Sequence, residues 1–114
     1  MIVSTAPFIA GHRVTETKGQ TFGLVVRSRG LAGNVVAGLR SLVGGEIHEY
    51  TQLLEDTRRQ AIDRMVQNAA LMGGNAVISM RFDSSEMAQT MTEIVAYGTA
   101  VVVVPDASAP QAQE

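Results

Sequence analysis

The apolar pattern along the chain is clearest between Tyr50 and Val104, where a helical period gives way to strict alternation. From Tyr50 to Met72, apolar residues recur at the i, i+3, i+4, i+7 spacing that predicts an amphipathic helix with one buried stripe. On its polar face, Glu55 and Arg59 stand at the spacing of a favourable i,i+4 ion pair. We expect Gly73-Gly74 to end this helix. At 1.5 Å per residue it would be roughly 35 Å long, which predicts that it lies diagonally across a sheet.

Two strands after this helix predict a hairpin. The first spans Asn75 to Asp83, and the polar segment Ser84 to Thr90 is expected to form its loop. The second strand ends at Pro105, which cannot donate a backbone hydrogen bond. Alternation in the first strand puts Ala76, Ile78, Met80 and Phe82 on one face and Val77, Ser79 and Arg81 on the other. In the second it puts Ile94, Ala96, Ala100, Val102 and Val104 on one face and Val95, Tyr97, Val101 and Val103 on the other.

The N-terminal half predicts shorter elements. A first strand at Ile2 to Thr5 is stopped by Pro7, and Gly11-His12 is expected to turn. The next β-prone stretches are Arg13 to Thr17 and Phe22 to Val26, separated by a break at Lys18-Gly19. Leu31 to Val43 has helical spacing, ends at Gly44-Gly45, and contains internal glycines that predict close packing against a neighbouring backbone.

Both faces of the last strand are apolar, and this feature predicts assembly. A strand with two apolar faces is usually buried on both sides. Two helices can cover one face of a small sheet, and a 114-residue chain then has no third layer to cover the other. We therefore expect a homo-oligomer with Val95, Tyr97, Val101 and Val103 in or near the subunit contact. The alternative is that the chain's own N-terminal segment covers part of this strand.

Composition narrows the class of protein. The length predicts one domain over residues 1–104, and the small, polar stretch 105–114 is expected to be a disordered tail. The formal net charge is −2 and Lys18 is the only lysine, which disfavours a nucleic-acid partner. The absence of cysteine excludes a disulfide framework and a thiolate site. No apolar run approaches the roughly 20 residues of a membrane helix, so we expect a cytoplasmic protein without a membrane partner.

Two segments of the chain are specific enough to suggest a family: Gly74-Asn75-Ala76-Val77 before a strand ending in Phe82-Asp83, and Tyr97-Gly98-Thr99-Ala100. With them the chain resembles the YbjQ-like family of small bacterial proteins, which carries the description "putative heavy-metal-binding". The resemblance covers about residues 1–104. The family usually has Ala where this chain has Gly73 or Gly74. The resemblance implies an α+β fold in two layers, similar to a dodecin subunit, with helices on one face of an antiparallel sheet. It also implies a ring-like homopentamer, and it implies no established reaction or cofactor.

The family description directs attention to metal ligands, of which this sequence has few. A soft metal needs thiolate, imidazole or thioether groups. The candidates are His48 with Glu49, and Met87 with Met91, the latter pair spaced like thioether ligands for Cu(I) with Met80 as a possible neighbour. A solvated helix start is the preferred explanation of the first pair, and flexible packing side chains are the preferred explanation of the second. Asp83, Glu86 and Glu93 could hold a hard cation, but an ordinary acidic loop explains them as well.

Four polar residues lie at positions that match the family: Tyr50, Arg58, Asn75 and Tyr97. Tyr50 and Arg58 are two helical turns apart, and Arg58 borders the apolar stripe, so it could pair with an acid across a subunit boundary. A structural tyrosine–arginine network is the alternative. Asn75 is expected to act as a cap or turn residue after Gly74.

Two functions fit this sequence. The first is a non-catalytic homo-oligomeric protein that binds a metal or small ligand at subunit junctions. The second is an enzyme whose active site is assembled between subunits, from Tyr50, Arg58 or Glu46 and residues of a neighbouring copy. The sequence has no recognisable nucleophile with an oriented base, which favours the first.

Overall fold

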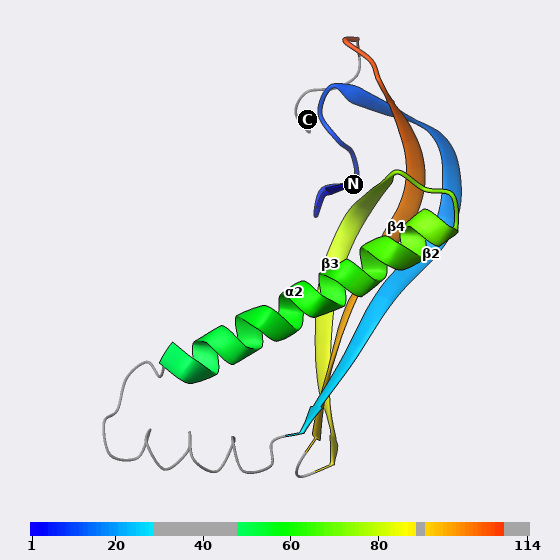
Figure 1. The fold of residues 1–114 in the computed structure, drawn as a ribbon. Helices are drawn as coiled ribbons and strands as arrows, with labels where there is room; N and C mark the ends of the chain where they lie inside the picture. Colours follow the sequence, from blue (N-terminus) through cyan, green and yellow to red (C-terminus); the bar gives the residue numbers. More distant parts are fainter. Residues whose placement is uncertain (29–47, 89–90, 109–114) are drawn as a thin grey trace.

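In the described part of the chain, one long helix crosses one face of a four-stranded sheet (Figure 1). This computed structural model describes residues 1–28, 48–88 and 91–108, with the side chains of residues 28, 48–50, 87 and 88 left out. The elements are β1 (Ile2–Val3), β2 (His12–Ser28), α2 (His48–Leu71), β3 (Ala76–Ala88) and β4 (Met91–Pro105). The strand order is β1-β3-β4-β2, with β1 parallel to β3 and the other pairs antiparallel. The predicted α+β class is confirmed, but the prediction of an antiparallel sheet is wrong for β1, which pairs with β3 in parallel and makes the sheet mixed.

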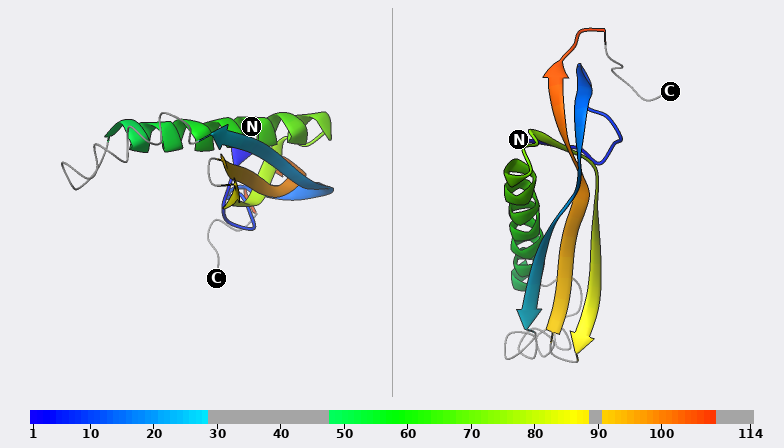
Figure 2. Two further views of the ribbon diagram at one scale, coloured as in Figure 1. Left: turned by 90° about the horizontal axis from the view of Figure 1, so that it is seen from below. Right: turned by 90° about the vertical axis from the view of Figure 1, so that its right-hand side faces the viewer.

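Helix α2 follows the predicted diagonal course, and its small buried residues explain how close it comes to the sheet (Figure 2). Ala61, Met65 and Ala69, on the side of the helix that faces the sheet, are fully buried. A Cβ atom built on Gly23 of β2 would collide with the backbone of α2 at Ala61 and Met65. Glycine at this position therefore lets the helix backbone rest directly on the strand. Because α2 covers this side, we call it the helix face and the opposite side the outer face.

Strand β2 runs without interruption from His12 to Ser28, so the predicted break at Lys18-Gly19 is wrong. The pairing register with β4 shifts between Thr17 and Gly19, and Gly19 has φ of +123°. An extra residue is accommodated there as a bulge, which glycine allows because it has no Cβ. Gly19, which by sequence suggests the end of a strand, instead lies at a bulge within one long strand.

A second bulge in β3 corrects the predicted faces of that strand. Ser79 has φ of +55°, and the register against β4 shifts between Ile78 and Arg81. Val77, Met80 and Phe82 consequently pack in the core on the helix face, whereas Ala76 and Ile78 pack in a second cluster on the outer face. The period-two pattern fails here because an inserted residue reverses the alternation.

Gly98 of β4 lies opposite this bulge and makes room for it. A Cβ atom on Gly98 would come within 2.7 Å of Val77 Cγ1 and 2.9 Å of the Ile78 carbonyl oxygen. Gly98 is therefore required by the close approach of β3.

The β3–β4 hairpin is tighter than predicted. Residues 84–88, which were expected to form a polar loop, continue β3 and pair with β4 as far as Ala88 and Met91. Polar residues on an exposed hairpin end favour a loop by composition, but the backbone ladder extends through them.

Val101 and Val103 of β4 are buried within the chain itself, at 1% and 5% exposure. They pack with Ala76 on the outer face, where Ile9 of the N-terminal segment covers them. This segment is held in place because the Ser4 and Ala6 carbonyls accept hydrogen bonds from Met80 and Ser79. A subunit is therefore not needed to cover these two valines, because the N-terminal segment weighed as the alternative packs against them. That they lie in or near a subunit contact stays a prediction.

Other predictions near the termini and junctions have separate outcomes. The first strand is shorter than Ile2 to Thr5 and comprises Ile2–Val3. Gly73 has φ of +90° where α2 ends, as predicted. The predicted helix over 31–43, its Gly44-Gly45 end, Glu46, and tail residues 109–114 lie outside the described residues.

Candidate functional site

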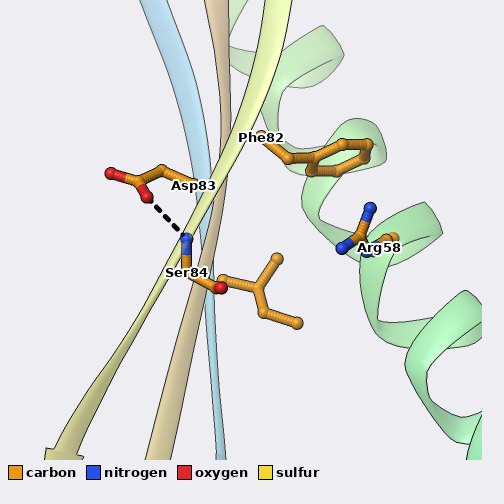
Figure 3. A pocket seen from close by; sticks show the side chains of 5 residues that line it. Arg58, Phe82, Asp83 and Ser84 are labelled. Carbon is orange, nitrogen blue, oxygen red and sulfur yellow. Dashed lines mark hydrogen bonds between the residues drawn. The ribbon is translucent and has the colours of Figure 1, made fainter.

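A small pocket lies on the helix face between α2 and the hairpin (Figure 3). Its volume is about 160 Å³, and its lining residues come from three elements: Arg58 of α2, Phe82, Asp83 and Ser84 of β3, and Ile94 of β4. The register pairs Phe82 with Ala96 and Ser84 with Ile94, so alternate β3 side chains face the helix here. The bulge at Ser79 sets this phase, since without it Phe82 would point to the outer face.

Arg58 is the charged group of this pocket. Its guanidinium carbon lies 4.9 Å from the centre of the Phe82 ring, a cation–π contact. The next residue, Arg59, extends along the solvent side of α2 towards Glu55 and Asp56, at 3.8 and 3.7 Å. The predicted Glu55–Arg59 pair is therefore present, although it is too exposed to stabilise the fold by more than a few tenths of a kcal/mol.

The other polar residues of the pocket, Asp83 and Ser84, have side chains on opposite faces of β3. The Asp83 carboxylate accepts a hydrogen bond from the Ser84 backbone N–H at 2.9 Å. Figure 3 shows Asp83 and Phe82 on opposite sides of β3, with only Phe82 directed towards Arg58. The pocket interior thus presents a cation, an aromatic ring and an aliphatic floor at Ile94, which is 5% exposed.

The side chains of three of the four predicted polar residues, Arg58, Asn75 and Tyr97, are described by the structure, and they do not contact one another. Asn75 is structural: its side-chain nitrogen donates to the Val103 carbonyl at 3.0 Å, and its side-chain oxygen accepts from the Val103 N–H at 2.8 Å. Tyr97 pairs with Phe22 on the outer face, and Arg58 lies on the helix face. The Tyr50 side chain lies outside the described part of the chain.

Phe82 and Ser84 are pocket residues that the sequence did not identify as a site. Phe82 is placed on the same strand face as other apolar residues by alternation, which predicts a core position. Phe82 is partly exposed beside Arg58 because of the distance between α2 and β3 at this point. The local sequence does not predict that distance.

The metal candidates do not converge where side chains are described. Within residues 1–28, 48–88 and 91–108, no group of three or more His, Asp or Glu side chains is placed to hold an ion. His12 Nδ1 lies 2.9 Å from the Ala10 carbonyl, and β2 and α2 begin at opposite ends of the molecule (Figure 1). Met80 is buried in the core, and Met91 is partly exposed at the start of β4. The side chains of His48, Glu49 and Met87 lie outside the described part.

The outer face of the sheet carries exposed apolar side chains at its β2–β4 end. Phe22, Leu24 and Val26 are 52%, 40% and 46% exposed and alternate with buried Thr21, Gly23 and Val25. In register, Phe22 is opposite Tyr97 and Leu24 is opposite Val95, so these side chains share the outer face. We call Phe22, Leu24, Val26, Val95 and Tyr97 the outer patch.

Helix side chains cover part of the free edge of β2. Asn68 Nδ2 donates to the Phe22 carbonyl at 2.7 Å, and an Arg64 guanidinium nitrogen donates to the Leu24 carbonyl at 2.5 Å. These bonds occupy backbone acceptors that an edge strand would otherwise offer to another strand. The outer patch is consequently a face for side-chain packing more than an edge for strand addition.

The fold defines a small two-layer α+β protein with one helix packed on a sheet, and comparison with known proteins gives its family. Residues 1–104 match the family model described as "Putative heavy-metal-binding". The chain belongs to this YbjQ family, as the sequence resemblance predicted.

Similar proteins from bacteria and archaea carry the name UPF0145 protein. One from Bradyrhizobium sp. (strain ORS 278) is 62% identical over 105 residues, 92% of this chain and 95% of that protein. One from Methanoregula boonei is 60% identical over 109 residues, 96% of this chain and 91% of that protein. The predicted restriction to bacteria is therefore too narrow.

A solved structure supports the fold. The crystal structure of a protein of unknown function of the DUF74 family from Pediococcus pentosaceus has a TM-score of 0.63 at 15% sequence identity, over 91% of this chain and 98% of that one. None of the helices within the described ranges is long and apolar enough to span a membrane.

Proposed function

We propose that this protein is a non-catalytic subunit of a homo-oligomeric ring that holds a metal or small ligand at its subunit junctions. The observation that carries the proposal is the outer patch, whose five apolar side chains face away from the chain's only described helix. Contiguous exposed apolar surface of this kind usually marks an interaction site. The family resemblance supplies the number of copies, five.

A second copy of the chain is the partner that best fits the outer patch. The formal net charge of −2 opposes self-association only weakly. A closed ring of more than two copies needs two different surfaces that meet head to tail. Leu53 and Leu54 of α2, 37% and 39% exposed, supply a second apolar surface on the opposite side of the sheet. The ring then buries the outer patch of one copy beneath the helix start of the next.

Ring symmetry also bears on the family description. A metal site needs several ligands around one ion. The described part of one chain does not bring three His, Asp or Glu groups together. A junction between copies would repeat each ligand around the ring, so a single histidine or methionine per chain could be enough to form a site there.

Native mass spectrometry of the purified protein tests the assembly and the metal together. We expect a pentamer for the wild type, and a monomer for Phe22→Ser/Leu24→Ser with the helical and strand content unchanged by circular dichroism. Leu71→Ser is the matched control, because Leu71 at 86% is the most exposed large apolar side chain among the described residues and lies outside both proposed surfaces. This control should remain a pentamer.

The same spectra recorded after separate additions of Zn²⁺, Cu⁺ and Ni²⁺ report any bound ion. Retention of one ion per chain or per ring, lost in the monomeric double variant, would place the ion at a junction as proposed. Retention by the monomer would contradict a junction site. A wild type that is monomeric at micromolar concentration would overturn the ring itself.

A further inference from the structure

We propose that the pocket beside Arg58 binds a small monocarboxylate with a short apolar chain. The proposal concerns a pocket formed within one chain and does not depend on the proposed ring. It rests on the juxtaposition of the Arg58 guanidinium, the Phe82 ring, Ser84 and the Ile94 floor around a volume of about 160 Å³.

The charge of Arg58 is the first reason. Among the described residues, its one recorded contact is with the Phe82 ring, and no carboxylate lies within 4.0 Å of its guanidinium. The acids on the same helix turn, Glu55 and Asp56, are directed to Arg59 instead. Asp83 is directed to the other side of β3 (Figure 3). A cation that borders a pocket and forms no ion pair with a described carboxylate favours an anionic ligand.

The geometry of the guanidinium is the second reason. The guanidinium carbon lies over the ring of Phe82, and none of the N–H groups of Arg58 donates a hydrogen bond to a described residue. A planar carboxylate matches those N–H groups with two parallel hydrogen bonds. Lysine in the same place would present a point charge without this match.

The remaining lining selects the size and chemistry of the ligand. The volume of about 160 Å³ is well below the roughly 300–1,000 Å³ of sites for drug-sized ligands, so the pocket suits a smaller ligand. Ile94 and Phe82 provide apolar surface for a short carbon chain, and the Ser84 segment adds polar groups at the rim. A phosphate would leave the apolar floor unused and would have one arginine for two negative charges.

A titration followed by ¹H–¹⁵N NMR tests this inference, with sodium butyrate as the probe. We expect butyrate to shift the backbone resonances of residues 82–84 and 94 and to saturate with a dissociation constant of about 1 mM, typical of a ligand with so few atoms. Butan-1-ol, which has the same chain without the charge, should bind at least about tenfold more weakly, as should inorganic phosphate.

Variants locate the interaction on one guanidinium. Arg58→Gln should weaken butyrate binding at least about tenfold, and Arg58→Lys should weaken it by an intermediate amount because charge remains without the fork of donors. Arg59→Gln removes the same charge one residue away, outside the pocket, and should leave the affinity within about twofold of the wild type. The spectra also report whether each variant remains folded.

Three results would overturn the proposal. The first is the absence of a saturable shift with butyrate in the folded wild type. The second is that butan-1-ol binds as tightly as butyrate, or that phosphate binds more tightly. The third is that Arg58→Gln and Arg59→Gln lower the butyrate affinity equally. Repeating the titration on Phe22→Ser/Leu24→Ser separates this result from the ring, because a single-chain pocket should keep its butyrate affinity when the ring dissociates.

Discussion

The side chain of Asn75 forms a pair of hydrogen bonds with the backbone of Val103, one through each of its amide atoms. Strand β3 begins only at Ala76, so the side chain takes the place of a further strand residue and completes the pairing of β4. Asn75, which the sequence predicts to be a cap or turn residue after Gly74, therefore uses its side chain to extend the hydrogen bonding of the sheet.

Asn75→Ala should destabilise the protein by about 1–3 kcal/mol, because it removes both bonds and leaves partly buried groups of Val103 without these partners. For a chain of this size, thermal denaturation should show a fall of roughly 4 °C in Tm for each kcal/mol. Gln67→Ala, on the solvent face of α2, is the control and should change Tm little.

Asn75→Asp gives a sharper version of the same test. The carboxylate keeps an acceptor for the Val103 N–H but turns a second oxygen towards the Val103 carbonyl, where the wild type has a donor. This repulsion should raise the pKa of the new carboxyl, so its protonated form favours the fold. The stability of the variant relative to the wild type should then increase as the pH falls through that pKa. A pH-independent difference would argue against the paired geometry.

Gly98→Ala should destabilise the protein by about 1–3 kcal/mol through overpacking, because the new methyl group meets Val77 and the Ile78 carbonyl at the β3 bulge. Gly74→Ala is the matched comparison, since its Cβ would have looser neighbours, at 3.2 Å or more. Urea denaturation should rank Gly98→Ala as clearly the less stable of the two. The reverse order would contradict the close approach at Gly98.

Thr57→Val should cost about 1–2 kcal/mol. The buried Thr57 hydroxyl donates to the Leu53 carbonyl at 2.7 Å and accepts from Arg27 Nε at 3.2 Å, and so ties the end of β2 to α2. Valine preserves the shape and removes both bonds. Thr57→Ser keeps the hydroxyl and should lose less, as measured by urea denaturation. Equal losses would show that packing of the methyl group, and not the hydroxyl, matters here.

Asp106 should titrate below its ordinary range. Its pKa is lowered chiefly by the side-chain and backbone hydrogen bonds from Ser108. Desolvation opposes this shift, and the charge of Arg13 at 3.2 Å lowers the pKa by the smallest amount. A depressed pKa in the folded state means that these contacts stabilise the chain end above the ordinary pKa of 3.8 and are lost as the pH falls through the folded value. An NMR titration of the side-chain carboxyl should show its pKa rising in Ser108→Ala by more than in Arg13→Gln.

The strongest agreement between sequence and structure concerns α2 and the general course of β3 and β4. The apolar stripe of α2 repeats over six turns, and local spacing of that length leaves one way to bury it. Gly73 also ends the helix as its sequence position suggests, because a left-handed backbone there favours glycine.

The register of the strands and the residues that line the pocket, in contrast, depend on tertiary contacts. Gly19 and Ser79 sit in bulges, and each bulge reverses the alternation on which a prediction of strand faces depends. The reversal at Ser79 turns Phe82 towards Arg58 and so creates the pocket. A single inserted residue in β3 cannot be read from hydrophobicity, since Ala76, Ile78, Met80 and Phe82 keep the period-two spacing of an unbroken strand.

The sequence by itself determined the family, the α+β class and the length and buried stripe of the helix, because these depend on short-range periodicity and on motifs of a few residues. Only the tertiary structure decided that the N-terminal segment covers Val101 and Val103, that the outer patch remains exposed, and that Arg58 meets Phe82. These contacts join segments tens of residues apart, and their geometry follows from bulges and from the angle at which α2 crosses the sheet. Local sequence patterns carry no record of that angle.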